Sequence, residues 1–261
     1  MKKYAVAIDV SPSEQIGDDD EQILSLGALF GLKTKESFDL VGDKFPEVEN
    51  RMRLRKFAGS SERYRTDLLA HLCAIRQSGH VVCGISVVNQ RFIRRVGLPV
   101  WTRANGEIPA PSSFNKKGKP RVELGGYLVD GKIKPAYEVL IDDLAIIGWL
   151  ALEIGMVHRM LCDISHSLVN LDVIIDKLPN DQGAEGSNKS ELLKGTLAKL
   201  ADNTVSVVGH PDVSDFYQRD LLVDNLAGLG RELFTSPLIQ NPKAELERVV
   251  GISKVNLPTS G

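Results

Sequence analysis

The chain alternates short apolar runs with longer segments in which apolar residues recur every three or four positions. The first run, Tyr4–Ile8, has no polar break and ends at Asp9. After an acidic turn at 17–21, a second apolar run spans 23–32. A continuous apolar run of this length is typical of a strand buried on both faces, and two such runs in succession predict a hairpin.

Other parts of the chain show either strand or helix patterns. β-Branched and apolar runs predict strands at 81–88, 171–176 and 205–208. A weaker signal at 38–41 suggests a strand directly after the two strands of the hairpin. Helical spacing of apolar residues, with capping residues before several segments, predicts helices at 61–78, 143–166, 189–201 and 215–234. This order predicts an α/β fold with a mixed central sheet flanked by helices.

We expect one main domain over residues 1–236, followed by a C-terminal arm at 237–261 that contains a short helix at 243–250. Prolines and clustered basic residues set 91–137 apart, and Asp130-Gly131 inside it is a hairpin signal. We interpret 91–137 as an insertion that carries a small β-ribbon. It would contact either nucleic acid or a protein partner, and the sequence does not choose between them.

Composition restricts the class of protein. A formal net charge of -2 over 261 residues gives no global affinity for nucleic acid, so any such affinity must come from local basic patches. The three cysteines contain no C-x-x-C pair, which argues against a disulfide framework and favours the reducing cytoplasm. The apolar stretch 144–162 carries Glu153, His158 and Arg159, so we interpret it as a buried helix and expect no membrane contact.

Three aspartates form the candidate catalytic site. Asp9 and Asp176 each end a predicted buried strand, and Asp224 lies on the last long helix. Hydrolysis of a phosphodiester by two divalent ions, about 3.5–4 Å apart, requires hard oxygen ligands on rigid elements. We therefore expect Asp9, Asp176 and Asp224 to be catalytic and to hold Mg²⁺ or Mn²⁺. Taken alone, Asp9 is also compatible with a simple turn residue.

Basic residues near the predicted helix at 61–78 are candidates for binding a nucleic-acid backbone. Basic and apolar residues alternate over 51–56, which predicts a strand with a cationic face that carries Arg53, Arg55 and Lys56. Arg63 follows in the first turn of the helix. A charged outer surface with no ligand is the alternative explanation for this basic stretch.

Short motifs around the three aspartates resemble those of the ribonuclease H-like superfamily. In particular the chain resembles the domain-of-unknown-function family numbered thirty-eight hundred, which opens with a strand ending in an aspartate-glutamate-serine motif. The corresponding segments here are Ile8–Ser11, Ile174–Asp176 and Leu222–Gly228. The resemblance covers most of residues 1–236. It implies a ribonuclease H-like sheet, a metal-dependent nuclease acting on DNA or RNA at the same aspartates, and a role in bacterial defence or a mobile element.

The chain departs from this family at Val10, which stands where the family has a glutamate. A fourth carboxylate would then come from Glu62, Asp67, Glu153 or Asp220. The departure keeps open a second interpretation, a catalytically decayed scaffold or nucleic-acid-binding subunit of a larger complex. A sugar kinase or actin-like ATPase is disfavoured because a second phosphate-binding glycine loop is missing. A haloacid-dehalogenase phosphatase is disfavoured because Ser11 occupies the place of its second aspartate.

Overall fold

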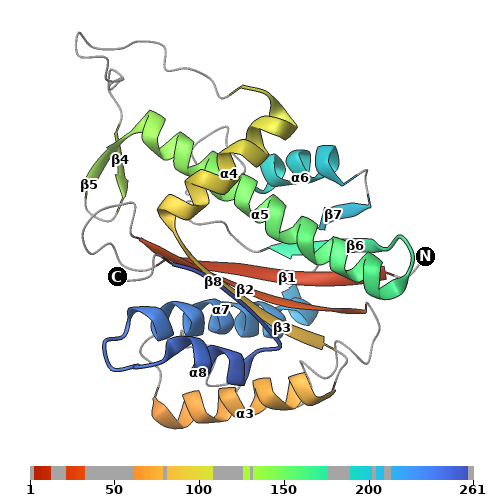
Figure 1. Ribbon diagram of the computed structural model, residues 1–261, viewed down its shortest axis with the longest axis vertical. Coiled ribbons are helices and arrows are strands. Elements are labelled where there is room, and N and C mark those ends of the chain that lie inside the picture. The colour runs from red at the N-terminus through yellow and green to blue at the C-terminus, as the bar shows by residue number, and fades with distance from the viewer. Residues whose placement is uncertain are drawn as a thin grey trace.

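The structure, a computed structural model, describes residues 3–12, 22–32, 61–78, 81–107, 126–129, 132–175, 189–201, 204–208 and 213–257. A mixed six-stranded sheet lies between two layers of helices, in the strand order β7-β6-β1-β2-β3-β8 (Figure 1). Its strands are β1 (Lys3–Pro12), β2 (Ile23–Leu32), β3 (Val81–Asn89), β6 (Asn170–Ile175), β7 (Val205–Val208) and β8 (Ile252–Asn256). The predicted α/β class with a mixed, helix-flanked sheet is confirmed.

The first strand occupies the middle of the sheet. β1 pairs antiparallel with β2, as the predicted hairpin requires, and parallel with β6 on its other side. Alternate residues of β1 enter two separate cores, with Ala5 and Ala7 on one face and Val6 and Ile8 on the other. The prediction that this strand is buried on both faces is therefore confirmed.

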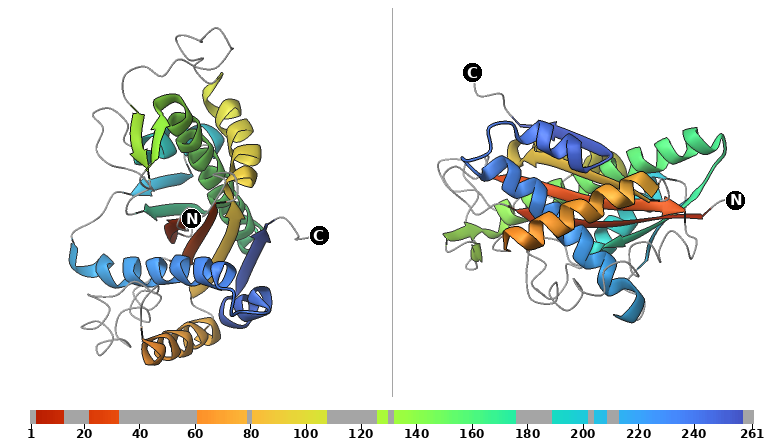
Figure 2. Two further views of the ribbon diagram at one scale, coloured as in Figure 1. Left: turned by 90° about the vertical axis from the view of Figure 1, so that its left-hand side faces the viewer. Right: turned by 90° about the horizontal axis from the view of Figure 1, so that it is seen from below.

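Helices of the described part of the chain cover both faces of the sheet (Figures 1 and 2). One layer contains α4 (Gln90–Asn105), α5 (Ala136–Ser165) and α6 (Lys189–Leu200). The opposite layer contains α3 (Glu62–Ser78), α7 (Val213–Thr235) and α8 (Pro242–Val249). Within the described part of the chain, no helix is both long enough and apolar enough to cross a membrane.

The helix predicted at 61–78 forms for the reasons that its sequence suggests. The Ser61 hydroxyl accepts a hydrogen bond from the Tyr64 backbone N–H at 3.3 Å, which caps the first turn of α3. Leu68, Leu72 and Ile75 recur at helical spacing and are at most 1% exposed. They bury one face of α3 in the core that also contains α7.

The first part of the expected insertion is a core helix. Asn89 caps α4 by accepting a hydrogen bond from the Phe92 backbone N–H at 2.9 Å. Gly97 on α4 and Gly148 on α5 face each other, and a Cβ at either would overlap backbone atoms of the other helix. Because both residues lack a Cβ, the two helices pack in direct backbone contact. The expected ribbon is present as antiparallel strands β4 (Gly126–Val129) and β5 (Lys132–Pro135).

The C-terminal segment also differs from the expected arm. The predicted short helix is present as α8, and its Leu246 and Val249 are buried in the core. The chain then forms β8, which pairs parallel with β3 and extends the main sheet. Burial of these apolar residues fixes the segment against the domain. The strands predicted at 38–41 and 51–56 lie outside the described residues.

Candidate functional site

The site begins with the face of β1 on which Asp9 lies. Strand alternation places Asp9 on the same face as Ala5 and Ala7, which pack in the core beneath α7. Val10 points to the opposite face, is 7% exposed and packs in the core formed with α5. The position where the family has a glutamate is therefore not on the Asp9 face of the strand.

Helix α7 approaches the sheet closely beside Asp9. Asp9 pairs in register with Gly27 on β2. A Cβ built at Gly27 would lie 2.6 Å from both the Val223 carbonyl oxygen and the Ala227 backbone nitrogen. Only a residue without a side chain allows this contact. Glycine at position 27 therefore lets the backbone of α7 pack directly against β2, beside Asp9.

The orientation of Asp224 follows from a second contact on the same helix. The Arg231 guanidinium donates a hydrogen bond to the Pro12 carbonyl oxygen at 3.1 Å, so this side of α7 faces β1. Asp224 lies seven residues before Arg231, which is two helical turns and the same side of the helix. The step from Asp224 to Arg231 is about 10 Å along α7, and the step from Asp9 to Pro12 is about 10 Å along β1. Asp224 therefore lies on the side of α7 turned toward β1, near the level of Asp9.

Helix α3 supports this part of α7. The Tyr64 hydroxyl donates a hydrogen bond to Asn225 Oδ1 at 3.0 Å, and Asn225 is 0% exposed. An ion pair between Arg65 and Glu232 joins the same two helices two turns further along α7. Burial raises the pKa of Tyr64 to about 12; the hydrogen bond to Asn225 opposes this change, and the negative charge of Asp224 adds to it. The charge of Asp224 therefore acts on the Tyr64 hydroxyl, at the contact between α3 and α7.

Among the other predicted site residues, the structure describes only Arg63. Asp176, Arg53, Arg55 and Lys56 lie outside the described residues. Arg63 is exposed on the first turn of α3. Among the residues that the structure describes, no group of three or more histidines, cysteines, aspartates and glutamates could hold a metal ion. Of the three expected ligands, the described residues contain Asp9 and Asp224.

Of the four candidates for a fourth carboxylate, the described contacts place Glu153 away from Asp9. Glu62 and Asp67 are exposed on α3. Glu153 lies on α5, across the sheet, where its Oε1 accepts a hydrogen bond from Lys254 Nζ at 2.8 Å. The sequence suggested Arg159 or another residue as the partner of Glu153, and the partner is Lys254. The side chain of Asp220 lies outside the described residues.

Sequence reasoning missed a set of polar contacts that joins α4, α5 and α6. Arg94 Nε donates to Asp142 Oδ1 at 2.7 Å, and Lys189 Nζ lies 2.8 Å from Asp143 Oδ1. The Lys189 side chain is only 4% exposed. The adjacent pair Asp142-Asp143 at the start of an apolar helix was the available signal, because carboxylates in such a position require buried cationic partners.

Comparison of the chain with protein-family models, with curated proteins and with solved structures finds no match.

Proposed function

We propose that this protein is a divalent-metal-dependent nuclease of the ribonuclease H-like superfamily that hydrolyses phosphodiester bonds in DNA or RNA. In this proposal Asp9, Asp176 and Asp224 hold Mg²⁺ or Mn²⁺. The mixed sheet, in which β1 lies between the antiparallel β2 and the parallel β6, supports the expected architecture. A role in bacterial defence or a mobile element remains part of the proposal on the resemblance alone.

The observation that carries the proposal is the way α7 lies over β1. Two residues more than two hundred positions apart in sequence, Asp9 and Asp224, lie at the same level of facing elements. This placement rests on the contact of α7 with Gly27 and on the hydrogen bond from Arg231 to Pro12. A closely packed helix and a central strand hold two carboxylates with little freedom to reorganise, as a metal site requires.

The strand register supports Asp176 as the third ligand. Ile8 and Ile175 are direct partners in the parallel pair of β1 and β6. The next residue along the sequence is an aspartate in both cases, Asp9 and Asp176. The proposal assigns both carboxylates to the same end of the sheet.

The chemistry follows from this ligand set. Carboxylate oxygens are the ligands that Mg²⁺ and Mn²⁺ prefer, and such ions activate a water molecule and stabilise the leaving oxygen of a phosphodiester. Asp9, Asp176 and Asp224 would orient the ions, and Arg63, with Arg53, Arg55 and Lys56, would bind the phosphate backbone. The ribbon formed by β4 and β5 is the part of the expected insertion that we propose as a protein contact. We keep the cytoplasm as the proposed location.

Cleavage assays with isosteric variants test this proposal. Single- and double-stranded DNA and RNA are incubated with the protein in Mg²⁺, in Mn²⁺ and in a chelator. Asp9→Asn and Asp224→Asn should each lower the cleavage rate by about 100-fold or more, because each removes a charged ligand. The matched control is Asp163→Asn, on the far part of α5, whose side chain is 70% exposed. Equal cleavage by the wild type, Asp9→Asn and Asp224→Asn would overturn the proposal.

A second candidate function is a nucleic-acid-binding scaffold without catalysis. It is favoured by the position of Glu153, which binds Lys254 across the sheet and so does not add a fourth carboxylate beside Asp9. This candidate predicts binding of an oligonucleotide with no cleavage under any metal condition, and binding that is unchanged in Asp9→Asn. Filter binding on the same substrates separates it from the nuclease proposal.

A further inference from the structure

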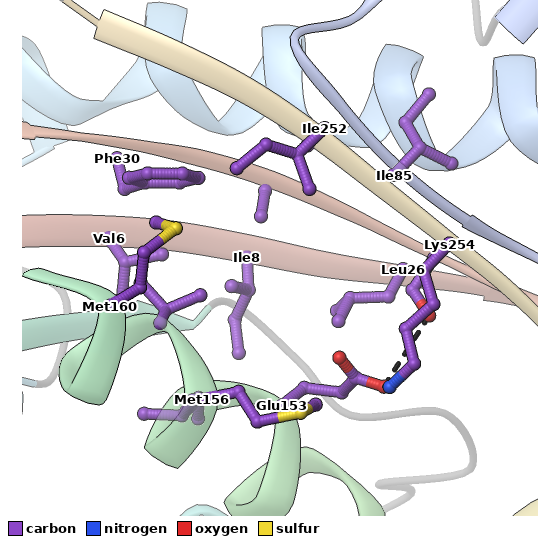
Figure 3. A pocket seen from close by; sticks show the side chains of 15 residues that line it. Val6, Ile8, Leu26, Phe30, Ile85, Glu153, Met156, Met160, Ile252 and Lys254 are labelled. Carbon is purple, nitrogen blue, oxygen red and sulfur yellow. Dashed lines mark hydrogen bonds and ion pairs between the residues drawn. The ribbon is translucent and has the colours of Figure 1, made fainter. Parts of the chain in front are cut away.

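A pocket of about 200 Å³ lies across the sheet from the aspartates, between β1–β3, β8 and helix α5 (Figure 3). Its walls are almost entirely apolar, with Val6, Ile8 and Phe30 on the sheet and Met156 and Met160 on α5. Two of its lining residues, Met156 and Ile252, are 40% and 39% exposed, so the pocket is open to solvent. The pocket is therefore a separate feature from the candidate metal site.

Gly84, in the middle of β3, accounts for the space. A glycine weakens the interior of a strand because it has no side chain to pack and loses much backbone freedom on folding. Gly84 does not adopt a positive φ, and a Cβ added there would come no closer to a described atom than 3.7 Å, at Phe30. No packing contact within the described structure requires a glycine. A glycine inside a strand often marks a bulge, a tight bend, or the close approach of a ligand or of another backbone. Beyond its chain neighbours, the nearest described backbone atom is the Ile252 carbonyl oxygen, 3.9 Å from the added Cβ, so the space is compatible with a ligand.

One end of the pocket is polar. Glu153 is 9% exposed, and its Oε1 accepts hydrogen bonds from Trp149 Nε1 at 2.9 Å and from Lys254 Nζ at 2.8 Å. The Ser86 hydroxyl lies 3.5 Å from the same oxygen. Figure 3 shows the carboxylate and the ammonium group together beside the apolar walls.

The charge at this end restricts the ligand. Glu153 and Lys254 neutralise each other, so a charged ligand would add an uncompensated charge to an apolar pocket. A hydroxyl group can donate to the carboxylate and accept from the ammonium group without changing the net charge. An uncharged group that both donates and accepts hydrogen bonds therefore fits the polar end best.

We propose that this pocket binds a small, uncharged, largely apolar molecule that carries one hydroxyl group. An apolar cavity of about 150 Å³ accepts benzene, so this pocket accepts a ring with a short aliphatic chain, roughly ten non-hydrogen atoms. Met156 and Met160 can adjust to the shape of such a ligand because their side chains are unbranched and flexible. The inference is independent of the proposed nuclease activity.

The first test is a titration of the full-length protein with 4-propylphenol, followed by calorimetry or by protein NMR. We expect saturable binding of one molecule per chain. Propylbenzene, which lacks the hydroxyl group, should bind several-fold more weakly, and the charged 4-propylbenzoate more weakly still. Absence of saturable binding of 4-propylphenol up to its solubility limit would overturn the proposal, as would equal affinity for all three compounds.

The second test fills the pocket. Gly84→Val places two methyl groups in the space above β3 and should weaken binding of 4-propylphenol at least tenfold, with an unchanged or higher melting temperature. Gly84→Ala, whose single methyl group meets nothing closer than 3.7 Å, should cause a smaller loss in the same direction. Gly195→Ala on α6 is the control, because an added methyl group there meets nothing within 4 Å. Unchanged affinity in both Gly84 variants would refute the assignment.

Discussion

Replacing Gly27 with alanine tests the close approach of α7 to the sheet. The new methyl carbon would lie 2.6 Å from the backbone of Val223 and Ala227 and 2.9 Å from the Cβ of Leu226. Ordinary contacts begin at 3.4 Å, so strand and helix must separate by about 0.8 Å, the difference between 3.4 and 2.6 Å. Because two of the three contacts are with backbone atoms, rotation of a side chain cannot relieve them.

The expected cost is large for a single methyl group. Overpacking a well-packed core typically costs 1–3 kcal/mol, and we expect the upper part of this range, about 3 kcal/mol in the free energy of unfolding. The same displacement moves Asp224 away from Asp9. If these carboxylates share a metal ion, the affinity for Mn²⁺ should fall by about tenfold or more in the folded variant.

The measurement is guanidinium denaturation followed by circular dichroism, with a Mn²⁺ titration of the folded protein. Gly84→Ala is the matched control, since it makes the same change on the neighbouring strand with the nearest contact at 3.7 Å. Neither glycine has a positive φ, so both substitutions restrict the unfolded chain equally. We expect Gly84→Ala to change stability by less than about 1 kcal/mol. Equal destabilisation by the two variants would refute the packing argument.

Further predictions concern buried polar groups. Tyr64→Phe removes the hydrogen bond to Asn225 and should cost about 1–2 kcal/mol at neutral pH, measured by urea denaturation. Because the pKa of Tyr64 is about 12 in the folded protein and 10.0 ordinarily, the unfolded chain loses this proton first as the pH rises. Stability should therefore fall by about 1 kcal/mol per pH unit between about 10 and 12, and Tyr64→Phe should lack this part of the decline. Lys189→Met leaves Asp143 partly buried without this cation and should cost about 3 kcal/mol. Adding Asp143→Asn to Lys189→Met should restore part of the loss, and an additive double variant would contradict the pairing.

Local patterns were sufficient to identify most elements near the candidate site. The apolar run before Asp9 predicted β1, and the helical spacing of Leu222, Leu226 and Leu229 predicted the buried face of α7. Both signals are local, because a strand or helix buries the residues that its own period brings to one face. The α4 helix was missed because Pro99 and the clustered arginines obscured its pattern, although Asn89 is a good cap.

The partners of buried charges could not be derived in the same way. Glu153 required a cation, and the sequence suggested Arg159, six residues away on the same helix, or another residue. The observed partner, Lys254, belongs to β8, which reaches Glu153 only because the C-terminal segment adds a strand beside β3. Such a pairing depends on sheet order, and sheet order is set by contacts between distant segments.

The sequence by itself therefore determined most of the elements: the central strand, the hairpin, and the helices with their apolar faces. The expected end of the first strand at Asp9 was wrong, because β1 stays paired with β2 as far as Pro12. Only the tertiary structure decided that Asp224 turns toward β1 and Glu153 away from it, and that Gly84 leaves a pocket open under α5. The physical reason is that periodicity acts within one segment. The closeness of two segments depends on small residues such as Gly27, whose effect is visible only when the opposing backbone is in place.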